Sequence, residues 1–356
     1  MHVLPSLGAG GMEQLVIGLT ADATARGDTV VVAAAPGPWA ERARHAGATH
    51  AALPETSRAN VAGMTAAAAC LARWVRRFRP QVVHAHNPRM TLLARLALTA
   101  TRHNAVLIPT VHGLAPGDYR TASRILRGCA QRVVACAPSV ARSLVSAGFP
   151  PERVDVILNG AALQPAGPHR EAALRGSLGL GPAPVVAGLG RLVAQKDWPT
   201  LIGAAGYLPG PSYVVAGEGG LREHLADLAA AAGGQVRFVG LVDDVAALVG
   251  LASCVVFTST WEGLPLTLLE ALSLGAPVVA TAVDGVTDVV PETAALLVPP
   301  GNPRAVATAV ERVLNDSALA ASLRRDALAA AATWAPAQML AQYRHAYEAA
   351  LSAHPR

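Results

Sequence analysis

One stretch of the sequence sets the expected architecture: Ser253-Cys-Val-Val-Phe-Thr-Ser-Thr-Trp-Glu-Gly-Leu-Pro-Leu-Thr-Leu-Leu-Glu-Ala-Leu-Ser-Leu274. Residues 254–258 form a short apolar run rich in β-branched side chains, which predicts a strand buried on both faces, as in a parallel sheet. A turn at 261–264 follows, and Pro265 is predicted as the first helical residue. Proline suits that position because the first N–H of a helix has no partner within the helix, so its absence costs no hydrogen bond. The stretch therefore predicts a strand, a tight turn and a helix.

This unit predicts a ligand site, because ligands of open parallel sheets lie outside the carboxyl ends of the strands. Glu262 stands in the turn and Glu270 lies about 1.5 turns into the helix. A helix amino end attracts phosphate, and a carboxylate accepts sugar or ribose hydroxyls. The backbone N–H groups expected to be free there belong to Gly263, Leu264, Leu266 and Thr267. If each glutamate binds the hydroxyls of one sugar ring and the helix amides bind the phosphates between them, the ligand is a sugar nucleotide.

Length and composition indicate a soluble chain of two domains. The 356 residues exceed the usual size of one domain, roughly 100–200 residues, and 52% of them are apolar. No apolar run approaches the ~20 residues of a membrane helix, and the amino terminus lacks the pattern of a secretory leader. We expect a cytoplasmic protein. The four cysteines lack metal-ligand spacing, so buried reduced thiols are expected.

Charge is distributed unevenly along the chain. Residues 1–165 hold 17 arginines and 8 acidic residues, a net charge of +9, whereas residues 166–356 hold 12 basic and 16 acidic residues, a net charge of −4. A basic first half suits an anionic partner, such as a lipid surface or a phosphorylated acceptor. Nucleic acid is not expected, because no nucleic-acid motif or aromatic stacking pattern accompanies the arginines.

Two cations in the second half are placed to hold a diphosphate. Arg191 follows the predicted strand at 184–190, and Lys196, the only lysine in the sequence, precedes a helix from about Trp198. Arginine grips phosphate oxygens bidentately and lysine supplies a compact charge. The alternative is that Arg191 and Lys196 bind no ligand and only form ion pairs at the protein surface. Further along, Val239 to Leu241 end a strand and are the predicted nucleobase site, with Asp243 as a helix cap.

The first half offers a glycine-rich turn and several histidines. Gly8-Ala-Gly10-Gly11-Met-Glu13 lies between a strand and a helix, where backbone N–H groups can approach an anion; ordinary turn chemistry explains it equally well. His84 and His86 share one side of a strand, but no third ligand is apparent, so a metal site is not expected. His112 precedes a glycine at a strand end and could face a ligand or be structural.

The ordered set resembles the signature of the GT-B-fold retaining glycosyltransferases of family 4, the group called glycosyl transferases group 1. The resemblance covers nearly the whole chain and extends to the turn at 8–13, to Thr110-Val-His-Gly113 and to Leu158-Asn-Gly160. It implies an α/β fold of two Rossmann-like domains facing across a cleft. The expected domains are residues 1–165 on the acceptor side and 166–335 on the donor side, with a helix at 336–356 that packs back toward the first domain.

The resemblance also implies a role for each matching residue. Arg191 and Lys196 would hold the donor diphosphate. Glu262 would bind hydroxyls of the transferred sugar with support from the amides at 263–267, and Glu270 would hold the ribose. His112 would face the sugar, and Gly10 and Gly11 would close over the phosphates. The sequence contains no Asp-x-Asp, so no metal is expected and the two cations would take its place.

The expected reaction is transfer of a hexose from a nucleoside-diphosphate sugar to a glycan or lipid-linked acceptor, with retention at the anomeric carbon. Fixed donors would stabilise the charge that develops on the leaving diphosphate. The expected setting is cell-envelope or exopolysaccharide synthesis, with peripheral contact with an anionic membrane at the inner face of the plasma membrane. Two alternatives stay open: a nucleotide-sugar epimerase of related architecture and a catalytically silent binding module.

Overall fold

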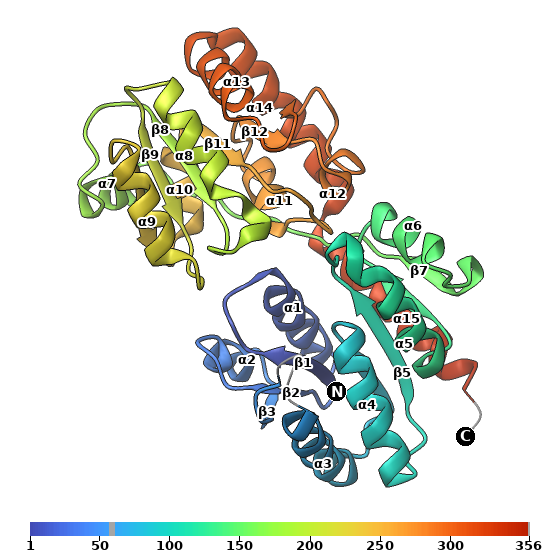
Figure 1. The fold of residues 1–356 in the computed structure, drawn as a ribbon. Coiled ribbons are helices and arrows are strands. Elements are labelled where there is room, and N and C mark those ends of the chain that lie inside the picture. Colours follow the sequence, from blue (N-terminus) through green and yellow to red (C-terminus); the bar gives the residue numbers. More distant parts are fainter. Residues whose placement is uncertain (57–60, 355–356) are drawn as a thin grey trace. The chain divides into compact units, whose positions relative to one another are not determined.

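The computed structural model describes residues 1–56 and 61–354, and the chain divides into two compact units. Unit 1 comprises Met1–Asn159 and Ala337–Arg356, and unit 2 comprises Gly160–Pro336. The boundary predicted at residue 165 therefore falls a few residues inside unit 2. Each unit holds one parallel sheet with helices on both faces (Figure 1).

The sheet of unit 1 has seven parallel strands in the order β3-β2-β1-β4-β5-β6-β7. The strands are β1 (His2–Ser6), β2 (Val31–Ala35), β3 (Thr49–Ala52), β4 (Val82–Ala85), β5 (Val106–Val111), β6 (Val133–Ala135) and β7 (Val154–Val156). The helices are α1 (Gly11–Ala25), α2 (Ala40–His45), α3 (Val61–Phe78), α4 (Pro88–Thr101), α5 (Tyr119–Cys129), α6 (Pro138–Ser146) and α15 (Pro336–Ser352), with short 3-10 turns η1 (Pro116–Asp118) and η2 (Pro151–Arg153).

The sheet of unit 2 has six parallel strands in the order β10-β9-β8-β11-β12-β13. The strands are β8 (Val185–Leu189), β9 (Ser212–Ala216), β10 (Val236–Gly240), β11 (Cys254–Phe257), β12 (Val278–Thr281) and β13 (Leu296–Val298). The helices are α7 (Pro168–Ser177), α8 (Trp198–Tyr207), α9 (Arg222–Ala231), α10 (Val245–Leu251), α11 (Leu266–Ser273), α12 (Asp284–Thr287), α13 (Pro303–Asn315) and α14 (Ser317–Ala331), with 3-10 turns η3 (Ala194–Lys196) and η4 (Ala332–Trp334).

Both sheets follow the doubly wound order, in which the strand order reverses next to the first strand of the unit. The reversal lies between β1 and β4 in unit 1 and between β8 and β11 in unit 2. Loops that leave neighbouring strands on opposite sides diverge there, and ligands of such sheets bind at that point. In unit 2 the loops concerned are 190–197 and 258–265.

The strands are apolar on both faces because both faces are covered. In β1 the neighbouring residues Val3 and Leu4 belong to separate core clusters on the two sides of the sheet, as the two-residue period of a strand requires. Val3 packs with α3 and α4, through side chains such as Leu71, and Leu4 packs with α1, through Val16. The continuous apolar runs of the sequence therefore encode a covered parallel sheet.

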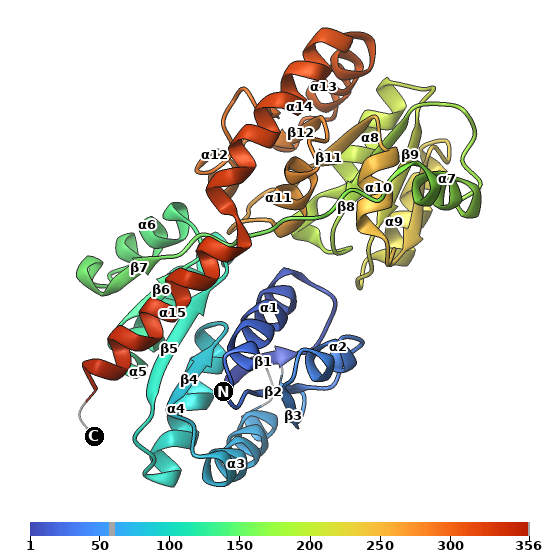
Figure 2. The ribbon, with the colours of Figure 1, turned by 180° about the vertical axis from the view of Figure 1, so that it is seen from behind.

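The C-terminal helix α15 is part of unit 1, where it lies along β5 (Figure 2). Its Met339 and Tyr343 are buried against Leu15 of α1 and Ile108 of β5. Arg344 adds an ion pair of 2.8 Å to Asp22 in α1. Among residues 1–56 and 61–354, no helix combines the length and the apolar character that crossing a bilayer would require.

Two local predictions are wrong by one residue. Pro265 is not the first helical residue but the N-cap of α11, because its ψ of 111° is extended. Asp244, and not Asp243, caps α10 through a 3.0 Å bond from the Ala247 N–H. Arg170 of α7 donates to both carboxylate oxygens of Asp244, at 2.6 and 2.7 Å. This contact distinguishes Asp244 from Asp243.

Candidate active site

The centre of the candidate site is an ion pair between the two loops at the switch point of unit 2. Lys196 ends the η3 turn after β8, and Glu262 lies in the turn between β11 and α11. The Lys196 Nζ is 2.5 Å from Glu262 Oε1, and the two side chains are only 11% and 7% exposed. The structure thus brings together two residues predicted from positions 66 apart in the sequence.

The Glu262 carboxylate is held by two further donors. Ser259 Oγ donates to Oε1 at 2.6 Å, and Gln195 Nε2 donates to Oε2 at 3.1 Å. Gln195 also donates to the Trp261 carbonyl at 3.0 Å, so its amide joins the two loops. Sequence reasoning missed Gln195 and Ser259; their only signal was proximity to Lys196 and Glu262.

The loops that carry the pair are fixed by hydrogen bonds to each other. Thr258 Oγ1 donates to the Lys196 carbonyl at 2.8 Å, and the Thr260 N–H donates to the Gln195 carbonyl at 2.9 Å. The buried Trp198 donates its indole N–H to the Arg191 carbonyl at 2.9 Å, which ties the first loop to the start of α8. The charged pair therefore sits on a rigid frame.

Two glycines permit close passage of the backbone beside the site. A Cβ on Gly217, whose φ is +153°, would lie 1.9 Å from the Gly190 carbonyl oxygen. A Cβ on Gly285, at the start of α12, would lie 2.3 Å from the Gly263 carbonyl oxygen. No side chain fits at such distances, so glycine at these positions lets the loops after β9 and β12 press against the site loops.

Further predicted residues of the donor half lie in the loop after β8 and in the turn and helix after β11. Arg191 is exposed after β8, and its guanidinium makes no hydrogen bond or ion pair within the described residues, which leaves it available to a ligand. Glu270 is buried in α11, at 5% exposure. Within the same described ranges, four N–H groups near the start of α11 donate to no other residue: those of Gly263, Leu264, Leu266 and Thr267.

The predicted nucleobase site lies at the carboxyl end of β10, the edge strand. A row of backbone bonds joins this end to the Arg191 loop: the Gly190 N–H donates to the Ala216 carbonyl at 3.0 Å, and the Gly217 N–H donates to the Gly240 carbonyl at 2.8 Å. Val239 is half-buried, whereas Leu241 is 53% exposed, high for a large apolar side chain. The structure records no direct contact of either with Lys196 or Glu262.

In unit 1 the histidines form a buried cluster around the switch point of that sheet. His2 of β1 lies 3.1 Å from His86, between Nδ1 and Nε2, and His86 Nδ1 lies 3.2 Å from His112 Nε2. His84 of β4 is bonded at both nitrogens, each 2.7 Å from a hydroxyl, those of Tyr347 and Thr110. Sequence reasoning overlooked His2, which stands in the neighbouring strand of the sheet.

The cluster alters one prediction about metal ligands. The prediction that His84 and His86 have no third potential ligand is wrong, because nitrogens of His2, His84 and His86 lie within 4.8 Å of one another. The hydroxyls on both nitrogens of His84 show that this ring is satisfied by hydrogen bonds. Burial lowers the pKa of all three rings well below 6.5, and loss of solvent lowers the pKa of His112 to about 4. The rings are therefore neutral at pH 7.

The glycine-rich turn of unit 1 leads directly into α1. Gly10 is the extended N-cap and Gly11 the first helical residue. The Glu13 carboxylate lies below the turn, with Oε2 2.8 Å from the place of a Cβ on Gly10, and its side chain is buried. A side chain at position 10 would displace Glu13, so glycine there serves the packing of the turn.

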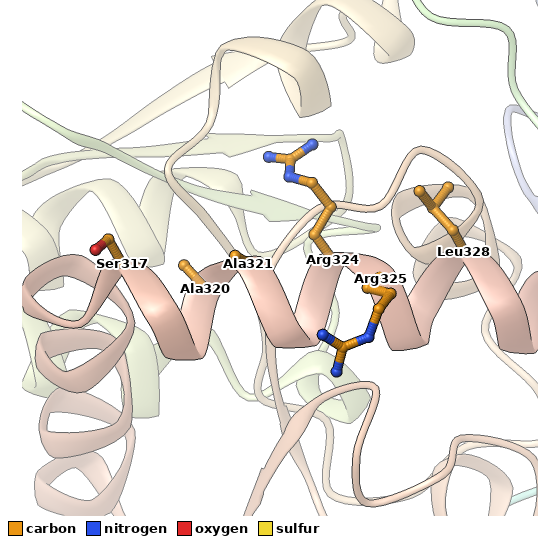
Figure 3. A pocket seen from close by; sticks show the side chains of 6 residues that line it. All are labelled: Ser317, Ala320, Ala321, Arg324, Arg325 and Leu328. Atoms are coloured by element: carbon orange, nitrogen blue, oxygen red, sulfur yellow. The ribbon is translucent and has the colours of Figure 1, made fainter.

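A shallow surface hollow follows α14, far along the sequence from these residues. Figure 3 shows its lining side chains in a row on the helix, with the guanidinium groups of Arg324 and Arg325 directed to opposite sides. It contains no carboxylate and none of the predicted site residues. The hollow therefore has no ion pair like that of Lys196 and Glu262 at the switch point of unit 2.

Two doubly wound units, one of them with a cation–carboxylate pair beside free helix amides, have the architecture of the GT-B glycosyltransferases. The structure of Anabaena Alr3699/HepE in complex with UDP and glucose superposes on the chain with a TM-score of 0.87 at 20% identity, over 98% of both chains. This likeness is one of fold. It confirms the predicted fold class, two Rossmann-like domains.

The sequence comparisons define the family. The profile described as Glycosyltransferase Family 4 matches residues 9–164, and the one described as Glycosyl transferases group 1 matches residues 172–330. The 2-deoxystreptamine N-acetyl-D-glucosaminyltransferase of Streptomyces fradiae is 30% identical over 90% of this chain and 86% of its own. The chain belongs to the family 4 glycosyltransferases, the glycosyl transferases group 1.

A second relative matches over a shorter range. The lipopolysaccharide core biosynthesis glycosyltransferase LpsE of Rhizobium meliloti is 35% identical over 140 residues, which are 38% of this chain and 41% of that protein. The chain thus spans about two fifths of the length of this relative. The predicted membership of the family 4 glycosyltransferases is confirmed.

Proposed function

We propose that the protein transfers a hexose-type sugar from a nucleoside-diphosphate sugar to a glycan or lipid-linked acceptor, with retention of the anomeric configuration. The observation that carries the proposal is the buried Lys196–Glu262 pair at the switch point of unit 2, beside the free N–H groups at the start of α11. A cation and amide donors suit a diphosphate, and a carboxylate suits the hydroxyls of the sugar.

The hydrogen bonds of Glu262 support a role in binding the sugar. A carboxylate offers about four acceptor sites on its two oxygens. Lys196 and Ser259 occupy Oε1, and Gln195 occupies one site on Oε2. One site on Oε2 remains for a sugar hydroxyl. Three donors also withdraw charge from the carboxylate and make it a poor nucleophile, which favours same-face attack over a covalent intermediate at Glu262.

The diphosphate is the group on which negative charge develops as the sugar departs. Arg191, exposed and unpaired in the described part of unit 2, would grip it bidentately, and Lys196 would supply the second charge. Fixed charges of this kind stabilise the transition state. In this proposal no metal is required, and the leaving phosphate oxygen takes the acceptor proton.

The remaining roles follow the same assignment. Glu270 binds the ribose, and Val239 and Leu241 flank the base, which we take to be uracil. From unit 1, His112 contacts the sugar of the bound donor, and the backbone of the Gly10–Gly11 turn contacts its phosphates. UDP and glucose are bound in the Anabaena structure named above, and this supports a UDP-sugar donor here.

The acceptor belongs to the basic unit 1 in this proposal, and the setting is the cell envelope or an extracellular polysaccharide. The relative from Rhizobium meliloti, whose name assigns it to lipopolysaccharide core synthesis, supports this setting. In α3, the exposed arginines at 73, 76 and 77 would contact anionic lipid at the inner face of a membrane.

Incubation with UDP- and GDP-sugars, with and without glycan or lipid-linked acceptors, tests the proposal by mass spectrometry. We expect acceptor-dependent release of the nucleoside diphosphate and a product whose anomeric configuration, read by NMR, matches the donor. An altered sugar nucleotide formed without acceptor would identify an epimerase, and donor binding without turnover a silent module. The Lys196→Ala/Glu262→Ala variant should lose the reaction, whereas the surface-pair control Arg325→Ala/Asp326→Ala should retain it.

A further inference from the structure

Three histidine rings of unit 1 are hydrogen-bonded in series. The first is His2 on β1, the second is His86 directly after β4, and the third is His112 directly after β5. The bonds join His2 Nδ1 to His86 Nε2 at 3.1 Å and His86 Nδ1 to His112 Nε2 at 3.2 Å. His2 and His86 are buried, at 6% and 0% exposure. The middle ring therefore uses both of its nitrogens on other histidines.

A neutral imidazole has one N–H and one lone pair. Desolvation lowers the pKa of each of these rings far enough that all are neutral at pH 7. His86 must then donate to one neighbour and accept from the other. If it donates from Nδ1 to His112, it accepts at Nε2 from His2 Nδ1; if it donates from Nε2 to His2, it accepts at Nδ1 from His112 Nε2.

Each choice fixes the proton on all three rings. In the first state His2, His86 and His112 all carry hydrogen on Nδ1, and in the second all carry it on Nε2. No mixed arrangement of neutral rings keeps both bonds. His84 stands outside the series, because its nitrogens bond to Tyr347 and Thr110, but its ring lies 4.0 Å from the His86 ring and packs against it.

We propose that His2, His86 and His112 share one tautomeric state, and that His2 and His86 are positioning residues which decide whether His112 Nδ1 donates to a ligand or accepts from it. Within the described residues only Nε2 of His112 is bonded, so Nδ1 is the nitrogen left for a ligand. The identity of that ligand, a donor sugar, rests on the proposed function; the coupling of the rings does not.

The state matters for the chemistry of recognition. With hydrogen on Nδ1, His112 can donate to a phosphate oxygen or to a sugar hydroxyl. With a lone pair on Nδ1, it can only accept, and a phosphate oxygen cannot bind it. A ligand that only accepts hydrogen bonds therefore draws the whole series into the Nδ1–H state, and the proton moves on His2 two rings away.

Long-range ¹H–¹⁵N NMR of the 356-residue chain, with ¹⁵N-labelled histidine at pH 7.5 and EDTA present, reads the tautomer of each ring without any substrate. We expect the same ratio of Nδ1–H to Nε2–H forms at His2 and His112. His86→Phe should make the two ratios independent, and His50→Gln, a histidine of β3 bonded to the Ala34 carbonyl, should leave them equal. Unequal ratios in the wild type, or rings doubly protonated at this pH, would overturn the proposal.

A second variant decides the matter if His86→Phe does not fold. Within the described residues, His2 makes no hydrogen bond or ring contact with His112, so the tautomer ratio of His112 should change in His2→Leu only through His86; an unchanged ratio overturns the coupling. In steady-state kinetics with the donor, kcat/KM should fall about three- to ten-fold in His2→Leu, the usual effect of one hydrogen bond, and His2→Asn, whose amide replaces Nδ1, should restore most of it. If no donor is turned over, the proposed function fails while the NMR result stands.

Discussion

Separating Lys196 from Glu262 should destabilise unit 2 by an amount that depends on which partner is removed. Removing one partner of a buried ion pair costs about 3–5 kcal/mol, because the other charge is left without compensation. Glu262→Leu leaves the Lys196 ammonium, 11% exposed, without its acceptor. Lys196→Met leaves a carboxylate that still accepts from Ser259 and Gln195.

The structure therefore predicts an unequal pair of single variants. We expect a loss of about 3–4 kcal/mol for Glu262→Leu and about 2 kcal/mol for Lys196→Met. The variant with both changes removes the two charges together, so its loss should be smaller than the sum by about 2–3 kcal/mol. For a unit of this size the larger loss lowers the melting temperature by roughly 6–15 °C.

Differential scanning calorimetry of the whole chain is the assay, supported by urea unfolding of the four proteins of the cycle. The same cycle on the exposed pair Arg325 and Asp326 is the matched control and should give a coupling below about 1 kcal/mol. A coupling at Lys196 and Glu262 no larger than this control, or a larger loss for Lys196→Met than for Glu262→Leu, would refute the reasoning.

Three further predictions address other parts of the chain. Gly217→Ala should cost at least about 2 kcal/mol in urea unfolding, because its Cβ would lie 1.9 Å from the Gly190 carbonyl oxygen, whereas Gly176→Ala, with open space around it in α7, should not destabilise. The melting temperature of unit 1 should fall as the pH falls from 7.5 to 5.5, because burial lowers the pKa of His2, His84 and His86 well below 6.5 in the folded unit. The unfolded chain therefore binds protons that the folded unit excludes, and unchanged melting over this range would contradict the prediction. The fraction of protein that sediments with anionic vesicles should decrease when the α3 arginines at 73, 76 and 77 are replaced by glutamine, with neutral vesicles as the control. Equal fractions for the variant and the wild type would argue against a lipid contact.

Much of the fold could be predicted from the sequence, because periodicity reports burial. The run at 254–257 is apolar throughout since β11 is covered on both faces, and a turn and a helix follow it as predicted, with the helix beginning one residue later than expected. The convergence of Lys196 and Glu262 on one site also followed from pattern, because ligands bind at the carboxyl ends of parallel strands; the ion pair between them was not predicted.

The missed details depend on contacts between distant parts of the chain. Nothing in the local sequence shows whether Asp243 or Asp244 caps α10. The hydrogen bond from Arg170, 74 residues away, to Asp244 distinguishes the two. Gln195 and Ser259 are ordinary polar residues until the fold places them on Glu262. His2 stands alone in the sequence and joins His84 and His86 only because β1 and β4 are neighbours in the sheet.

The central claim is that the Lys196–Glu262 pair marks the site of a nucleoside-diphosphate sugar. A crystal structure with a bound UDP-sugar tests it most directly. The account predicts diphosphate oxygens at roughly 3 Å from Lys196 Nζ and from the Arg191 guanidinium, with a sugar hydroxyl on Glu262 Oε2. A donor bound elsewhere in unit 2, with the diphosphate out of reach of both cations, would contradict it.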